Sequence, residues 1–183
     1  MTAILPVKIH KVSIDQTILQ TIYPGHSFYK DKWIDIIKGI GDKMNRSTNI
    51  KGSMTEYEEL LNHSEFDPLK DFAISIAEEH PYHNVDTLDC KIDNMWGAIY
   101  NKGDHAVPHW HNPYNYSFVY YLQSNENSSP LCFTDSTNQF YIPPTESSFV
   151  LFPAYLFHHV PQQKDDTDRI IIAGNIFTKD KKK

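Results

Sequence analysis

The sequence has no long hydrophobic run, few cysteines and almost no arginine. No apolar stretch approaches the roughly 20 residues that a membrane-spanning helix needs. The N-terminal stretch MTAILPVKIHKVSID becomes charged too early for a secretory signal peptide. We therefore expect a soluble, cytoplasmic protein. Cys90 and Cys132 are the only cysteines, and in a reducing compartment we expect free thiols.

An excess of positive charge is also missing. The chain has 17 basic and 23 acidic residues, which gives a formal net charge of −6. This balance argues against a protein that coats nucleic acid or an anionic membrane, because both would repel it. The 183 residues are 40% hydrophobic and show no internal repeat, so we expect a single domain over residues 1–183.

The first half of the chain, residues 1–88, is predicted to be a mainly helical flank. After a possible first strand in VKIHKVSI, apolar residues recur three and four positions apart within residues 27–45 and 55–80. Thr55 and Glu58 resemble a capping box that would open a helix over EYEELLNH. Pro81 is expected to end the last helix.

The second half changes to short β-rich runs. These runs are MWGAIY, SFVYYLQ, PLCFTD, SSFVLFP and DRIIIAGNIF, separated by turn-rich segments such as NKGD and SNENSSP. The pattern predicts an antiparallel sandwich or barrel over residues 89–178, with the helices packed outside it and a basic tail at 179–183. The fold class is therefore predicted as α+β with a β core.

Five of the ten histidines lie between His105 and His159. In VPHWHNP, at the predicted start of a strand, His109 and His111 share one face if the segment is extended. Two imidazoles suit iron, zinc, copper or nickel, although such a pair can also be surface decoration or a hydrogen-bonded core feature. FPAYLFHHV offers a third ligand at His158 or His159, and strand alternation turns only one of them inward.

Arginine occurs only twice, and Arg169 opens the apolar run RIIIAGNIF. With a period of two, both faces of this run are apolar, so we expect the strand to be covered on both sides and the guanidinium to be drawn inward. A buried guanidinium needs a partner, and its planar fork suits a carboxylate. Asp166 or Asp168 could pair with it, but we favour a bound dicarboxylate because His158 lies eleven residues earlier.

The segments WGAIYNKGDHAVPHWHNPYNYSFVYYL and FPAYLFHHVPQQKDDTDRIIIAGNIF resemble the Fe(II)/2-oxoglutarate-dependent oxygenases. They look most like a microbial and viral branch that carries H-x-H, a serine before V-Y-Y-L, then F-P-x-x-L-x-H-x-V and R-x-x-I-x-x-N. The resemblance covers residues from about 90 to 178. It implies a double-stranded β-helix, the jelly roll of this family, with iron inside its open end.

The resemblance also implies the metal ligands. His109 and His111 match the proximal pair, and His158 matches the distal ligand, with His159 as its neighbour. In the wider superfamily a carboxylate stands where this chain has His111. Three neutral ligands would leave the metal's charge uncompensated until a dianionic cosubstrate binds. The alternative is that Asp104 or Asp135 supplies a carboxylate in place of His111.

The implied cosubstrate is 2-oxoglutarate, whose far carboxylate would be gripped by Arg169. Tyr100 lies near where related enzymes place a tyrosine hydroxyl on that carboxylate, and Asn175 matches a family position of less certain role. The implied activity is hydroxylation of an unidentified small molecule or peptide, with release of succinate and CO2 and with ascorbate as a stimulant. The aromatic side chains offered as pocket walls are Trp110, Tyr114, Tyr116, Tyr120 and Tyr121.

Two other functions compete with this interpretation. A cupin-type three-histidine dioxygenase would need no 2-oxoglutarate; Gly103 followed by H-W-H fits its motif, but Asn115 and Tyr116 stand where its glutamate is expected. Arg169 would have no task in such an enzyme. A non-catalytic metal-binding β-sandwich module would hold structural zinc, which usually takes four protein ligands, and no convincing fourth is visible.

Overall fold

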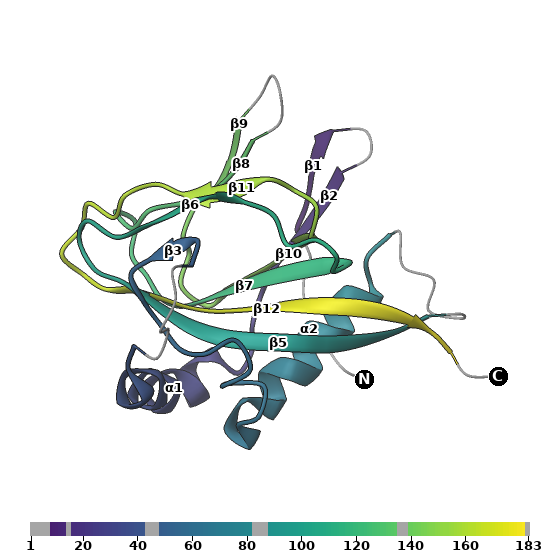
Figure 1. Cartoon of the computed structure of the whole chain (residues 1–183), viewed down its shortest axis with the longest axis horizontal. Helices are drawn as coiled ribbons and strands as arrows, with labels where there is room; N and C mark the ends of the chain where they lie inside the picture. The colour runs from purple at the N-terminus through teal and green to yellow at the C-terminus, as the bar shows by residue number, and fades with distance from the viewer. Residues whose placement is uncertain (1–7, 14–15, 43–47, 82–87, 135–138, 182–183) are drawn as a thin grey trace.

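Two antiparallel sheets form the body of the protein. The computed structural model describes residues 8–13, 16–42, 48–81, 88–134 and 139–181. The larger sheet contains, in spatial order, β1 (Lys8–Ser13), β2 (Gln16–Ile22), β10 (Ser148–Pro153), β7 (Tyr116–Gln123), β12 (Arg169–Asp180), β5 (Leu88–Tyr100) and β4 (Ser53–Met54). The smaller sheet contains β3 (Ile50–Lys51), β6 (His105–His109), β11 (His158–Val160), β8 (Leu131–Thr134) and β9 (Gln139–Ile142). Figure 1 shows the two sheets stacked as a jelly roll.

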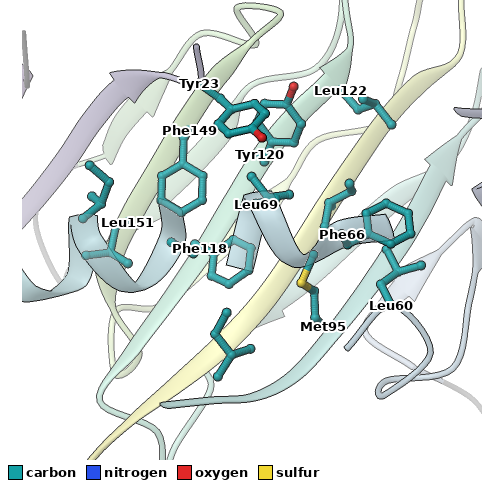
Figure 2. Close-up of a cluster of buried hydrophobic side chains, with 14 of the residues drawn as sticks. Tyr23, Leu60, Phe66, Leu69, Met95, Phe118, Tyr120, Leu122, Phe149 and Leu151 are labelled. Atoms are coloured by element: carbon teal, nitrogen blue, oxygen red, sulfur yellow. The ribbon is translucent and has the colours of Figure 1, made fainter. Parts of the chain in front are cut away.

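The helices cover the outer face of the larger sheet, as predicted (Figure 1). They are α1 (His26–Ile40), the short 3₁₀ helix η1 (Ser64–Phe66) and α2 (Asp67–Glu78). Trp33 of α1 and Leu69 of α2 are fully buried against strand side chains such as Tyr120. Figure 2 shows this helix–sheet core. None of the described helices is long and apolar enough to cross a membrane.

A second core fills the space between the two sheets. Along β12, Ile170 and Ile172 point toward the helices, whereas Ile171 and Ala173 point between the sheets. The strand is thus covered on both faces, which confirms the expectation from its sequence. The alternation places Arg169 between the sheets, where it is fully buried.

The N-terminal half contains more β structure than the sequence indicated. The expected strand in VKIHKVSI is present as β1, but the following strand β2 was not expected. β2 pairs with β10, so that residues from the two halves of the chain share one sheet. Its side chains alternate between the two cores, Ile18 between the sheets and Leu19 toward the helices. The strand is specified by this long-range pairing, which a local pattern does not reveal.

The predicted helix over EYEELLNH is wrong. Residues 57–62 form successive turns. The Thr55 hydroxyl, expected to cap a helix, instead accepts a hydrogen bond from Gly97 N of β5 at 3.1 Å. Backbone bonds from Met95 N to Tyr57 O (2.7 Å) and from Leu60 N to Met95 O (3.1 Å) tie the segment to the same strand. Backbone groups that would have formed hydrogen bonds within a helix therefore form them with the edge of β5.

Gly174 of β12 allows a close approach between strands, and its replacement is expected to destabilise the fold. A Cβ atom there would lie 2.7 Å from the Asn94 carbonyl oxygen and 2.7 Å from the Phe118 ring. We expect Gly174→Ala to lower the free energy of unfolding by about 1–3 kcal/mol. Urea denaturation measures this change.

Gly39 provides a matched control. It lies on the exposed face of α1, and a Cβ atom there would meet nothing within 4 Å. Because glycine costs helix stability relative to alanine, Gly39→Ala should raise the free energy of unfolding by ~0.5–1 kcal/mol. Equal changes in the free energy of unfolding of the two variants would contradict the close packing at Gly174.

Candidate metal centre

Three histidines from two neighbouring strands converge between the sheets. His109 ends β6, His111 follows two residues later, and His158 opens β11. β6 and β11 pair with His158 directly opposite His109. One ring nitrogen of each histidine lies within 4.8 Å of those of the other two. The sequence placed the pair at the start of a strand; the structure places it at the end of β6.

Backbone carbonyls orient two of the rings. His109 Nδ1 donates to Val107 O at 2.7 Å, and His158 Nδ1 donates to Leu156 O at 2.8 Å. A carbonyl can only accept a hydrogen bond, so the proton is on Nδ1 and the lone pair is on Nε2. Such carbonyl partners fix the tautomer of metal-binding histidines. Both rings thus present Nε2 as a ligand atom.

Burial keeps the three imidazoles neutral. It lowers the pKa of His111 to about 3, with a further lowering from His109. It also lowers the pKa of His158 well below the usual value, and the neighbouring histidines add to this effect. For His109, burial lowers the pKa although the hydrogen bond to Val107 opposes the shift. A neutral imidazole is the form that binds a metal, so the cluster has the donor set of a metal site.

The neighbouring groups that the sequence offered as ligands lie elsewhere. His159 lines a groove on the outer side of the smaller sheet together with His105. Asp104 lies in the turn between β5 and β6, where its Oδ2 accepts a hydrogen bond from Asn101 N at 2.8 Å. Among the described residues it is not part of the histidine group. Asp135 lies outside the described residues.

A cavity of about 40 Å³ extends from the three histidines to Arg169. Arg169 opens β12 and is paired with Tyr100 of β5. Its guanidinium carbon lies 4.7 Å from the centre of the Tyr100 ring and 5.1 Å from that of Tyr121. Between these ends the wall is apolar, with side chains that include Val119, Leu131 and Ile171.

The Arg169 guanidinium has no acceptor for any of its three nitrogens among the described residues. Asp168, a partner considered from sequence, lies 3.4 Å from Lys38 Nζ. Asp166, the other one, lies 2.9 Å from Lys102 Nζ. A fully buried, unpaired guanidinium is costly. Its position at the end of a cavity therefore indicates an anionic ligand.

The two tyrosines beside Arg169 stay protonated. Burial raises the pKa of Tyr100 to about 12, against the lowering effect of the guanidinium. Burial also raises the pKa of Tyr121, which Arg169 again opposes. The Tyr100 hydroxyl, which lines the cavity, can therefore donate a hydrogen bond to an anion there. Tyr121, expected from the sequence to be a pocket wall, lies against Arg169 but is not among the residues that line the cavity.

Asn175 lies on the same face of β12 but does not line this cavity. Its Oδ1 accepts a hydrogen bond from Ser117 Oγ at 2.6 Å, and its Nδ2 donates to Asn94 Oδ1 at 2.8 Å. Asn94 Nδ2 in turn donates to Tyr114 OH at 2.8 Å. The Asn175 amide thus links β5, β7 and β12, and cosubstrate binding by Asn175 stays a prediction.

The aromatic residues offered as pocket walls are distributed differently. Trp110 is 60% exposed and packs against Phe157 outside the cavity. Tyr116 and Tyr120 belong to the helix-side core. Trp96 of β5, which sequence analysis did not select, lines the cavity, and its ring centre lies 6.1 Å from that of His111. Trp96 lies four residues before Tyr100, so strand alternation puts both side chains on the same face of β5; this pattern could have identified it.

Solved structures that are similar to this chain include two prolyl hydroxylases and a protein with 2-oxoglutarate bound. A Pseudomonas putida prolyl-4-hydroxylase has a TM-score of 0.65 at 13% identity, over 89% of this chain and 93% of its own. The viral collagen prolyl hydroxylase of Paramecium Bursaria Chlorella virus-1, a 2OG complex, has a TM-score of 0.63 at 16% identity, over 91% and 98%. HygX from Streptomyces hygroscopicus, with nickel and 2-oxoglutarate bound, has a TM-score of 0.65 at 12% identity, over 86% and 82%.

These similarities confirm the jelly roll that the sequence resemblance implied. The histidine group fits the H-x-H…H pattern on which that resemblance was based. No protein-family model matches the sequence, and no curated protein sequence matches it. The identities are low, so the chemistry of this chain is argued from its own side chains.

Proposed function

We propose that the protein is an Fe(II)- and 2-oxoglutarate-dependent dioxygenase. The observation that carries this proposal is the pairing of two features in one cavity: three neutral imidazoles at one end and an unpaired, buried guanidinium at the other. A cupin-type dioxygenase needs the first feature but not the second. A structural zinc site would require a fourth ligand, and the group of described residues contains three.

The donor set suits a ferrous ion. His109, His111 and His158 would occupy one face of the metal and leave the opposite positions open. HygX binds nickel and 2-oxoglutarate, and the related epimerase SnoN binds Fe3+ and alpha ketoglutarate. When bound, iron and 2-oxoglutarate would activate O2, of which one oxygen atom oxidises 2-oxoglutarate to succinate and CO2 and the other hydroxylates a substrate C–H bond.

The chain's own residues would bind and orient the cosubstrate. Arg169 would pair with the far carboxylate through two parallel hydrogen bonds. Tyr100 would donate its phenolic proton to the same group. The apolar wall would exclude water from the space between, which strengthens both interactions. With three neutral ligands and Arg169, the cavity favours a dianion over a monoanion.

The substrate class is proposed from the molecules bound in similar structures and from the net charge of the chain. Among the similar structures, a Trichoplax adhaerens prolyl hydroxylase is in complex with a peptide fragment. HygX is also seen with hygromycin B, a small molecule. We propose a small molecule or a peptide, because the acidic net charge disfavours free nucleic acid.

Purified protein is expected to convert 2-oxoglutarate to equimolar succinate and CO2 when it is supplied with Fe(II) and ascorbate. Turnover without substrate is expected to be slow, so a discontinuous succinate assay in air over hours is the first measurement. Chelation of the metal should stop the reaction.

The competing functions give different results in the same assay. A cupin-type enzyme would consume oxygen with its substrate at the same rate whether or not 2-oxoglutarate is present. A non-catalytic binding module would bind metal and consume neither oxygen nor 2-oxoglutarate. Absence of succinate with the metal bound, across peptide and small-molecule substrate panels, would refute the proposed function.

A further inference from the structure

A second cleft reaches the three-histidine cluster from another direction. It has a volume of about 50 Å³ and lies between residues 48–57, which include β3 and β4, and side chains of β5 and β6. Its wall includes two polar residues at the outer end, two aromatic residues, and two of the proposed ligands: Thr48, Asn49, Tyr57, Trp96, His109 and His111.

The two hollows share one part of their walls and differ in the rest. Ile50, Trp96, His109 and His111 line both of them. Arg169 and Tyr100 line only the first. A dicarboxylate held by Arg169 would therefore occupy the first cavity and leave the second cleft for another molecule. That molecule would meet the metal position beside Trp96.

Trp96 has an unused hydrogen-bond donor at this junction. Its side chain is 4% exposed, and its Nε1–H, which is buried, has no partner among the described residues. The ring is held edge-on against Tyr57, with ring centres 5.2 Å apart and an interplanar angle of 82°. An indole can donate but cannot accept, and a buried donor without an acceptor is costly. The group that satisfies it must bring an oxygen or nitrogen acceptor.

The cleft wall is uncharged. None of its eight described residues has a carboxylate, an ammonium or a guanidinium group. Thr48 already donates its hydroxyl to Ile50 O at 2.9 Å. Asn49 is exposed at the outer end and has a side-chain carbonyl that can accept a hydrogen bond. An ionic group would lose its hydration here without gaining a counter-charge.

We propose that this second cleft binds an uncharged amide group of the substrate, and that Trp96 Nε1–H donates to its carbonyl oxygen. An amide supplies the acceptor that Trp96 requires and a donor for Asn49. Trp96 is then a specificity-determining residue of the dioxygenase proposed above, on which this inference rests. Free amino acids and other small ions are selected against by the uncharged wall.

The test uses three small probes and an unreactive enzyme complex. The protein is loaded with Mn(II) and N-oxalylglycine, so that the metal and the cosubstrate cavity are occupied without turnover. The probes are N-acetylglycinamide, which is neutral, N-acetylglycinate, an anion, and glycinamide, a cation. Paramagnetic relaxation of the probe protons by Mn(II) reports residence near the metal. We expect the neutral probe to be relaxed most, by about fivefold over the two ions.

Trp96→Phe keeps the ring against Tyr57 and removes only the N–H. We expect it to reduce the relaxation of the neutral probe by about fivefold, the size of one lost neutral hydrogen bond. Because Trp96 also lines the cosubstrate cavity, calorimetry of Mn(II) and N-oxalylglycine binding sets each variant to the same occupancy before the probe relaxation is compared. Trp110→Phe is the matched control, because Trp110 lies between two of the proposed ligands in the sequence but is 60% exposed and does not line the cleft. It should behave as wild type.

A second variant keeps the inference testable if Trp96→Phe does not fold. Asn49 is exposed, and Asn49→Asp places a carboxylate at the cleft's outer end. It should raise the relaxation of glycinamide and lower that of N-acetylglycinate. Equal relaxation of the three probes, or no effect of Trp96→Phe, would overturn the inference alone. Failure of wild-type protein to bind Mn(II) or N-oxalylglycine would overturn the proposed function and this inference with it.

Discussion

His158→Ala is expected to abolish binding of a divalent metal, whereas His159→Ala leaves it unchanged. The two residues are adjacent on β11, but His158 lies opposite His109 inside the cavity and His159 lines the outer groove. Loss of an outer-shell partner alone costs ~10–100-fold in metal affinity, so loss of a ligand should exceed that range. Equilibrium dialysis with Mn(II) or anaerobic Fe(II) measures the effect directly.

The His159→Ala variant is the control for general damage to the strand. Thermal unfolding of the metal-free proteins shows whether each variant keeps its fold. Added metal should raise the melting temperature of wild-type and His159→Ala protein, because a ligand that binds only the native state stabilises it. It should not raise that of folded His158→Ala protein. The reverse pattern would assign the distal ligand to His159.

Arg169→Lys is expected to weaken binding of 2-oxoglutarate by about 1.5–3 kcal/mol, roughly tenfold to a hundredfold in Kd. Lysine keeps the positive charge but cannot reproduce two parallel hydrogen bonds to a carboxylate. Anaerobic calorimetry on the metal-loaded protein gives the affinity. Metal binding without cosubstrate should be unaffected, because Arg169 does not belong to the proposed ligand group His109, His111 and His158. An unchanged Kd would remove Arg169 from the site.

Arg169→Met separates the functional role of this residue from a structural one. The guanidinium is fully buried and lacks an acceptor among the described residues, so it costs stability in the free protein. Replacing buried charges by well-packed apolar side chains can stabilise a protein by about 1–4 kcal/mol. We expect Arg169→Met to unfold at higher urea concentration and to lose 2-oxoglutarate binding. Lys102→Met, at an exposed ion pair with Asp166, should change neither property.

The β half of the protein was predictable because its strands have strong local patterns. Residues 116–123 and 169–180 are rich in β-branched and aromatic side chains, and they form the central strands β7 and β12. The burial of Arg169 followed from the apolar character of both faces of its strand. The likeness to solved oxygenases confirms the fold class that these patterns and the sequence resemblance indicated.

The N-terminal half was less predictable because distant partners specify it. β2 is a strand through its pairing with β10, and the turns after Thr55 follow from their bonds to β5. The role proposed for Trp96 was equally hidden. Its donor is notable only because the packing around it supplies no acceptor, and that packing involves Tyr57 from a segment expected to be helical.

The sequence by itself determined which chemical groups the protein possesses and which side of each strand they face. Imidazoles at His109 and His111, a histidine pair further along, and one arginine on an apolar strand are local features, and alternation orients them. The family resemblance assigned the distal ligand to His158, and the structure groups His158 with the pair. Only the tertiary structure decided that Lys38 rather than Arg169 pairs with Asp168. The reason is that a site of this kind depends on strand register. Register arises from pairing between segments far apart in the chain, and a shift of one residue would turn every ligand to the opposite face.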